Sequence, residues 1–256
     1  MNPIIDLNGF EIPEYTAIVA LGAAAGLLAA YLFLRTRSLR ASAANVFLDA
    51  ALVTFVAGWI GARAYHVVTH WDYYAARPEE IAQVGLGGLG IRGAFVLGLV
   101  SLVIYAAVRK ISFWYFADAA ALGLAIGQAI GWVGAFLQGA NYGVVSDSQI
   151  AMDLPDLYGL VQPRFPVQSA ETVFFALLFI GLLYAAMHHP RPGALFVAYL
   201  GLAAAANFAL GFQRGDETAF VGLLRIDQIV DAVFVVGATG LVLWRRTGAR
   251  NDGNVG

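Results

Sequence analysis

Long apolar runs, rather than an alternation of apolar and polar residues, dominate the pattern along this chain. Crossing a hydrocarbon core of about 30 Å takes roughly 20 helical residues, and several runs approach that length. Their continuity favours helices over the strands of a closed barrel, in which apolar and polar residues alternate. We therefore predict seven transmembrane helices: Tyr15–Leu34, Asn45–Ala64, Gly88–Val108, Phe116–Leu137, Glu171–Met187, Gly193–Gln213 and Ile226–Trp244.

The composition supports this prediction of a lipid environment. The 256 residues are 60% hydrophobic and only 12% charged, whereas soluble domains are about 25% charged. A net charge of −2 and the lack of long basic runs argue against nucleic acid as a partner, and the absence of cysteine excludes disulfides and thiolate metal sites. We predict an all-α integral membrane protein that forms a single polytopic domain, residues 1–256.

The distribution of charge predicts how the helices are oriented. Cytoplasmic connections are enriched in Lys and Arg, and alternate connections here carry the basic residues, which predicts an N-terminus outside and a C-terminus in the cytoplasm. We also expect a small external cap over about residues 144–170, where three prolines occur, and a short cytoplasmic tail over about residues 245–256. The basic residues are Arg35, Arg37, Arg40, Arg109, Lys110, Arg191, Arg245, Arg246 and Arg250.

Two features of the predicted helices suggest close packing or binding. Small residues recur every fourth position from Gly123 to Gly143, and such a face either packs against another helix, the interpretation we favour, or accepts an acyl chain. Arg92 lies at the outer end of the third predicted helix. An arginine at a helix centre costs about 2.5–3.5 kcal/mol, so we expect Arg92 either to face a polar cavity or phosphate or to reach the interface. Arg164 and Arg214 are further candidates for an anionic head group.

Other polar residues point to structural roles. His66 and His70 have the spacing of one helical face, but no third ligand follows, so we predict no metal site. Asp49 and Asp118 stand near the starts of the second and fourth predicted helices, where carboxylates cap helices. Asn207 and Asp231 are candidates for buried polar residues.

The order of several motifs over nearly the whole chain resembles the bacterial prolipoprotein diacylglyceryl transferase family. Four motifs carry the resemblance: Gly61-Ala62-Arg63-Ala64-Tyr65-His66, the glycine-framed stretch Gly131-Trp132-Val133-Gly134-Ala135-Phe136-Leu137-Gln138-Gly139-Ala140-Asn141-Tyr142-Gly143, Arg164-Phe165-Pro166-Val167-Gln168-Ser169-Ala170-Glu171 and the turn Pro190-Arg191-Pro192-Gly193. The resemblance implies transfer of the diacylglyceryl group of phosphatidylglycerol to a lipobox cysteine thiol, with release of glycerol phosphate. It also implies preprolipoprotein signal peptides as partners, no cofactor, and a place in the bacterial cytoplasmic (inner) membrane.

The resemblance also assigns site residues, and the chain departs from the family at several of them. Arg92 stands where the family has a histidine, and Trp132, Ala135 and Ala140 replace the signature arginine, asparagine and glutamate. Arg92 cannot act as a base, as a neutral histidine could, but it could replace the lost arginine as a phosphate clamp. Our catalytic candidates are Arg92 and Tyr15, and our head-group candidates are Arg92, Arg214, Arg164, Gln168 and Gly143; Tyr15, Gln168, Gly143, Glu171 and Gln228 match the family.

Three functions remain open from the sequence. The chain is either a divergent diacylglyceryl transferase with a rearranged site or a non-catalytic protein of the same fold that binds phosphatidylglycerol. A small transporter ranks last, because the first and fifth predicted helices offer almost no polar side chains for a path across the bilayer.

Overall fold

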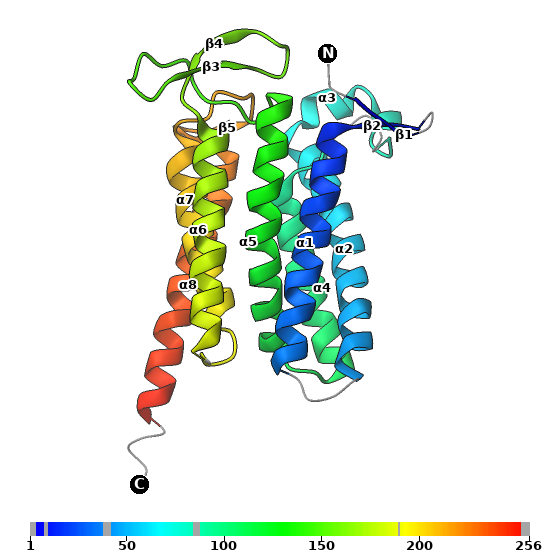
Figure 1. Ribbon diagram of the computed structural model, residues 1–256, viewed down its shortest axis with the longest axis vertical. Coiled ribbons are helices and arrows are strands. Elements are labelled where there is room, and N and C mark those ends of the chain that lie inside the picture. Colours follow the sequence, from blue (N-terminus) through cyan, green and yellow to red (C-terminus); the bar gives the residue numbers. More distant parts are fainter. Residues whose placement is uncertain (1–3, 8–9, 38–41, 84–87, 189, 252–256) are drawn as a thin grey trace. The chain divides into compact units, whose positions relative to one another are not determined.

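The computed structural model describes residues 4–7, 10–37, 42–83, 88–188 and 190–251. Within these ranges, seven helices are long and apolar enough to cross a membrane, which confirms the predicted all-α membrane fold. The direction in which they cross stays a prediction. The seven helices are α1 (Glu14–Arg37), α2 (Ser42–Thr69), α4 (Ile91–Arg109), α5 (Phe113–Gln138), α6 (Val167–Met187), α7 (Ala194–Gly211) and α8 (Ile226–Asn251) (Figure 1).

The helix ends differ from the predicted ones where polar residues continue a helix. α2 continues to Thr69, and α6 begins at Val167, ahead of the predicted start at Glu171. Gln168 and Glu171 are almost fully buried in the first turns of α6, so polar side chains that pack inside the protein extend a helix beyond its apolar run. α8 continues to Asn251, through part of the predicted tail; Arg40 and residues 252–256 lie outside the described residues.

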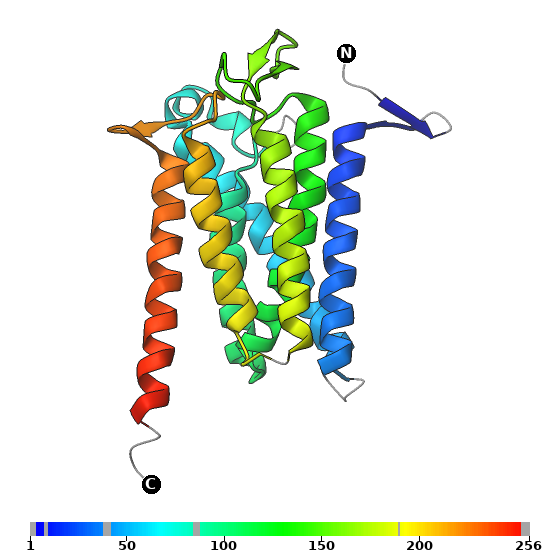
Figure 2. The same cartoon turned by 60° about the vertical axis from the view of Figure 1, so that its left-hand side comes forward.

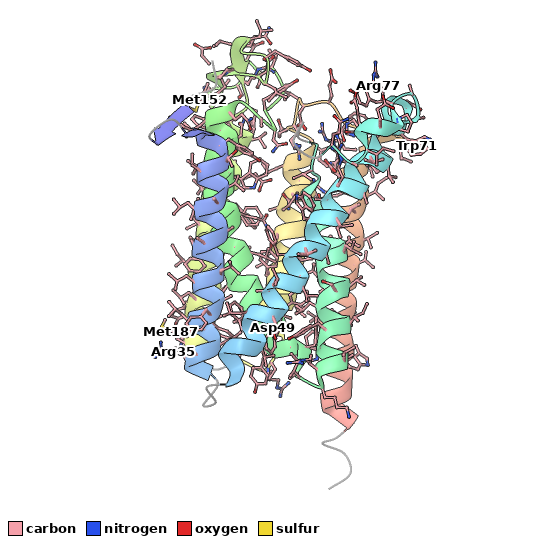
Figure 3. The ribbon with its side chains drawn as sticks, turned by 90° about the vertical axis from the view of Figure 1, so that its right-hand side faces the viewer. Arg35, Asp49, Trp71, Arg77, Met152 and Met187 are labelled. Carbon is pink, nitrogen blue, oxygen red and sulfur yellow. The ribbon has the colours of Figure 1, made fainter. Side chains whose placement is uncertain are left out.

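The chain folds into two compact units. The first unit comprises Met1–Leu32, Ala117–Glu217 and Asp231–Gly256, and the second comprises Phe33–Phe116 and Thr218–Val230. In the second unit, Arg35 and Asp49 lie at one end, whereas Trp71 and Arg77 lie at the other (Figure 3). The single domain predicted over residues 1–256 stays a prediction.

The small-residue stripe of the first unit packs α5 against α1 at two of its positions. A Cβ atom added to Gly123 would come within 2.6 Å of the carbonyl oxygen of Gly26, and one added to Gly127 would come within 3.3 Å of that of Gly22. Helix packing is therefore confirmed there. Gly131 has no neighbour within 4 Å of such an atom, and from residue 139 onward the stripe has left the helix.

The second unit is built on a close pair of helices, α2 and α4. The backbones of Gly61 and Gly93 come so close that a Cβ atom at either glycine would collide with the carbonyl oxygen of the other. This contact places the first turn of α4, which carries Arg92, beside the last turns of α2. The short helices α3 (Trp71–Ala75) and η1 (Pro78–Glu80) follow α2.

Among the described residues, three antiparallel β-hairpins stand outside the long helices. Their strands have two to four residues, too short to produce a readable alternation, so the sequence pattern did not predict them. The hairpin β3–β4 lies within the predicted cap. The strands are β1 (Ile4–Leu7) with β2 (Phe10–Pro13), β3 (Met152–Pro155) with β4 (Val161–Arg164), and β5 (Phe220–Val221) with β6 (Leu224–Arg225).

Asp118 has a capping role, but for a different helix from the predicted one. Its two carboxylate oxygens accept hydrogen bonds from the backbone N–H groups of Gly193 (2.6 Å) and Phe196 (2.9 Å), at the start of α7. Asp49 instead lies 3.9 Å from Arg109 in an exposed ion pair. The positions of these two carboxylates near helix starts therefore did not identify their partners, which the tertiary structure supplies.

Candidate functional site

Arg92 lies in a polar cluster of the second unit, between the first turns of α4 and α8 and the end of α2. Its Nη1 atom is 3.3 Å from Oδ2 of Asp227, and its Nε donates to the backbone oxygen of the same residue at 3.2 Å. The other oxygen of the Asp227 carboxylate accepts a hydrogen bond from the hydroxyl of Tyr65 at 2.7 Å. One carboxylate therefore holds a cation and a phenol together in a largely buried place.

The Arg92 side chain is only 11% exposed and faces a polar cluster. Its depth relative to the membrane interface stays a prediction. Asp227 and Tyr65 were not among the predicted site residues. The available signal was a carboxylate in the first turn of the last predicted helix, where the helix dipole favours a negative charge, but the sequence did not indicate which cation it would meet.

A second arginine of this unit organises the loop that leads into α4. Arg63 is buried and donates to the backbone oxygens of Ile81 (2.9 Å), Glu80 (2.6 Å) and Gly88 (3.2 Å). These contacts draw the loop back onto α2, and Gly90 donates its N–H to the carbonyl of Ala62 in the same place. Arg63 thus helps to set the position of Arg92 through the backbone.

The two histidines at the end of α2 stack on each other. The ring centroids of His66 and His70 are 4.2 Å apart, and Nδ1 of His70 lies 3.0 Å from the backbone oxygen of His66. Among the described residues, no group of three or more His, Asp or Glu side chains could hold a metal ion. The pair is part of the packing around α3.

Arg214 anchors a polar cluster in the first unit. Its guanidinium makes two bonds to the carboxylate of Asp216, at 2.8 and 2.6 Å, and a third to the amide oxygen of Asn141 at 2.8 Å. Its backbone forms an isolated bridge with Gly143. A Cβ atom on Gly143 would collide with the carbonyl oxygen of Phe165, so only a glycine lets these two segments of the backbone come so close.

Arg164 lies inside the segment predicted as the cap. It forms a buried ion pair with Asp156 (3.1 Å), donates to the backbone oxygen of Gly143 (3.3 Å), and lies over the ring of Tyr142. Burial raises the pKa of the Tyr142 phenol above its usual value, and the negative charge of Asp156 adds to this, whereas the cation of Arg164 opposes it. Arg164 therefore ties the hairpin to the chain around residue 143.

Gln168 and Tyr15 occupy different surroundings in the same unit. Gln168 is buried and donates from Nε2 to the backbone oxygen of Ala140 at 3.0 Å. Its amide oxygen has no hydrogen-bond partner among the described residues. Tyr15 lies in the first turn of α1 beside Gly134 of α5 and is 38% exposed. Among the polar candidates of the helices, Asp231 is buried as expected, whereas Asn207 is only partly buried.

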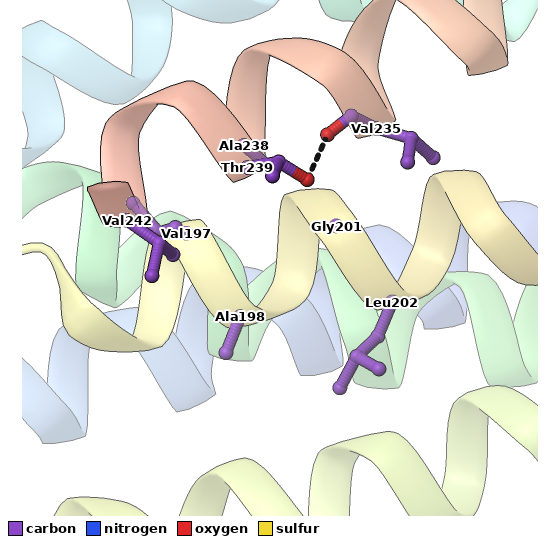
Figure 4. A pocket seen from close by; sticks show the side chains of 8 residues that line it. All are labelled: Val197, Ala198, Gly201, Leu202, Val235, Ala238, Thr239 and Val242. Carbon is purple, nitrogen blue, oxygen red and sulfur yellow. Dashed lines mark hydrogen bonds between the residues drawn. The ribbon is translucent and has the colours of Figure 1, made fainter. Parts of the chain in front are cut away.

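Four of the predicted head-group residues thus come together around residues 140–143 of the first unit: Gly143, Arg164, Gln168 and Arg214. Arg92 belongs to the cluster of the second unit. A separate groove of about 240 Å³ between α7 and α8 is lined by apolar and small residues with Thr239, whose hydroxyl bonds the backbone oxygen of Val235 (Figure 4). No charged side chain is among the residues that line it.

Seven helices long and apolar enough to cross a membrane, together with buried arginine–carboxylate pairs, define a polytopic membrane protein with polar clusters among its described residues. Comparison with known families is consistent with this class. Residues 3–244 match the family described as prolipoprotein diacylglyceryl transferase, and the chain belongs to that family. The resemblance seen in the motifs is therefore confirmed.

Relatives that carry the name phosphatidylglycerol–prolipoprotein diacylglyceryl transferase are similar over nearly their whole length. Those of Bacillus velezensis and Bacillus licheniformis are each 31% identical, and each alignment covers 96% of this chain and 93% of the relative. That of Symbiobacterium thermophilum is 31% identical, over 94% of this chain and 91% of the relative.

Proposed function

We propose that this protein transfers the diacylglyceryl group of phosphatidylglycerol to the thiol of a lipobox cysteine in a preprolipoprotein. The observation that carries the proposal is the family match over residues 3–244. In the reaction, the sulfur forms a bond to the carbon of the diacylglyceryl group that bears the phosphate. The bond from that carbon to the phosphate oxygen breaks. Glycerol phosphate leaves, and the thiol proton passes to a base.

Such a transfer needs cations for the phosphate and an acceptor for the proton. We assign the phosphate to Arg92, whose planar guanidinium matches phosphate oxygens; Arg214 remains a separate head-group candidate of the first unit. Because Arg92 cannot accept a proton, the acceptor that this cluster offers is the carboxylate of Asp227. Gln168, whose amide oxygen is buried, remains a head-group candidate of the first unit, and Tyr15 remains a catalytic candidate.

The proposal is tested by a reconstituted transfer assay with radiolabelled phosphatidylglycerol and a lipobox peptide. We expect transfer that requires the peptide cysteine and is lost when serine replaces it. Removal of a charge-assisted contact costs about 1.5–3 kcal/mol, so Arg92→Ala should lower kcat/KM by roughly 10- to 100-fold. The matched control is Arg77→Ala, because Arg77 is an exposed arginine of the same unit. This variant should retain activity.

A different result would identify the other function left open by the sequence. If the wild-type protein copurifies with phosphatidylglycerol but transfers nothing to the cysteine peptide, the protein is a non-catalytic lipid-binding member of the family. Equal losses in Arg92→Ala and Arg77→Ala would show that Arg92 has no specific part in the reaction.

We further propose that the protein lies in the bacterial cytoplasmic membrane, with residues 144–170 as a cap outside and the end of the chain in the cytoplasm. Since the chain has no cysteine, single-cysteine variants report the orientation directly. In intact cells a membrane-impermeant maleimide should label Tyr158→Cys but not Arg191→Cys. The reverse pattern would invert the topology.

A further inference from the structure

The hairpin β5–β6 presents an apolar tip. Leu223 is 94% exposed, and Phe220 and Val221 are each 60% exposed. Gly222, with a φ of +63°, allows the tight turn between the strands. Residues 218–224 contain no charged side chain. Contiguous exposed apolar side chains of this kind mark an interaction surface.

The position of the hairpin in the chain indicates what covers this tip. The strand β6 runs directly into α8, a helix apolar enough to cross the membrane from Ile226 onward. A chain rises at most about 3.6 Å per residue, so Leu223 lies within roughly 11 Å of the first residue of α8. In Figure 2 the hairpin leaves the start of α8 sideways rather than along the helix axis.

The base of the hairpin is polar and turned inward, unlike its tip. Arg225 is buried, with its guanidinium 5.8 Å from the ring centroid of Phe220, and its backbone N–H donates to the buried side chain of Gln228 at 3.0 Å. The N–H of Ile226 donates to the carbonyl of Ala219, which holds the strands to the helix. The hairpin therefore has a fixed polar base and a projecting apolar end.

We propose that the tip of the β5–β6 hairpin, Phe220 to Leu224, inserts among the acyl chains of the lipid leaflet that surrounds the start of α8. Burial of apolar surface in the acyl region stabilises such an element, and its polar base stays with the protein. Asp227 follows four positions after Leu223, so insertion of the tip places the Arg92–Asp227 pair at the depth of the lipid head groups. The proposal does not depend on transfer activity.

The hairpin β3–β4 provides a matched control, because its tip is also exposed. Tyr158 is 78% exposed and Leu157 and Leu160 are each 56% exposed, so this tip is apolar too, but its loop is closed by Asp156, whose carboxylate accepts the N–H groups of Tyr158 and Leu160. Tyr158 lies nine positions before the start of α6, and the adjoining strand β3 carries the charged residue Asp153. We expect it in water.

The experiment places one environment-sensitive NBD label on single-cysteine variants of the 256-residue chain, which has no cysteine of its own, in phosphatidylcholine vesicles. The label on Leu223→Cys should be quenched by nitroxide-bearing acyl chains and should be several-fold less sensitive to aqueous iodide than the label on Tyr158→Cys. Without any label, the thiol of Leu223→Cys should react several-fold more slowly with a charged methanethiosulfonate than that of Tyr158→Cys. Val221→Cys serves as a second variant with the same expectation.

The opposite pattern would overturn the proposal. If iodide quenches the labels at positions 221 and 223 as strongly as the label at position 158, and the acyl-chain quencher does not reach them, the hairpin tip lies in water. Because no lipid substrate or peptide is present, this outcome leaves the proposed transferase activity untouched, and loss of that activity would leave the insertion result untouched.

Discussion

Arg92 and Arg214 are equally buried, with side chains 11% and 10% exposed, yet they meet their carboxylates in different ways. Arg214 is bonded to Asp216, two positions along the chain, so local backbone geometry is enough to form the pair. Arg92 and Asp227 are 135 positions apart. The long-range pair exists only when α2, α4 and the start of α8 are assembled, and it therefore reports on the fold of its unit in a way that the local pair does not.

The largest expected difference between the two pairs is the loss in free energy of unfolding when each carboxylate is removed. Asp227→Ala leaves the positive charge of Arg92 largely buried without its carboxylate, which should lower the free energy of unfolding by about 3 kcal/mol. Asp216→Ala should cost about half as much, roughly 1.5 kcal/mol, because Arg214 keeps its bond to Asn141. Denaturant unfolding in detergent micelles measures both; equal losses would contradict the distinction.

The backbone contact beneath the Arg92 cluster provides a second way to perturb it. Gly93→Ala would press a methyl group against the carbonyl oxygen of Gly61 and the Cβ of Tyr65, and overpacking of this kind costs about 1–3 kcal/mol. Gly131→Ala, where the added atom meets nothing within 4 Å, is the control. It should be neutral or stabilise helix α5 by roughly 0.5 kcal/mol. Comparable destabilisation in both variants would show that the helix contact is not tight.

The phenol of the long-range cluster should contribute less than the ion pair. Tyr65→Phe removes one hydrogen bond to Asp227, so the expected loss of stability is about 1 kcal/mol. Tyr73→Phe removes an exposed hydrogen bond to Glu80 and should have an effect within about 0.5 kcal/mol. A loss in Tyr65→Phe as small as that in Tyr73→Phe would mean that the phenol does not help to hold Asp227.

The alkaline titration of Tyr142 tests the electrostatic surroundings of the local Arg214–Asp216 pair. Burial and the negative charges of Asp156, Asp216 and Glu217 raise the pKa of Tyr142. A raised folded-state pKa gives stability that is full below the unfolded value of about 10 and is lost as the pH rises through the folded value. The wild type should therefore lose stability above pH of about 10 relative to Tyr142→Phe. Unfolding curves between neutral and alkaline pH test this; parallel curves would contradict it.

Helix number and type could be predicted because each spanning helix satisfies its own backbone hydrogen bonds and needs only a long apolar run. The family could be predicted as well, because motifs such as Gly61 to His66 and Arg164 to Glu171 are contiguous in the chain. Arg92, Arg164, Gln168 and Arg214 were also identifiable, since charged and amide side chains near apolar helices are conspicuous.

Partners of those residues depended on the tertiary structure. Asp118 stands at the beginning of α5 but accepts the N–H groups that begin α7, and Asp227 meets an arginine 135 positions away. Hydrophobic periodicity describes one helix at a time, whereas such pairs depend on which helices the glycine contacts bring together. The sequence alone therefore determined the lipid environment, the seven helices and the family. Only the tertiary structure decided which cation meets which carboxylate, because burial enforces pairing without specifying the partner.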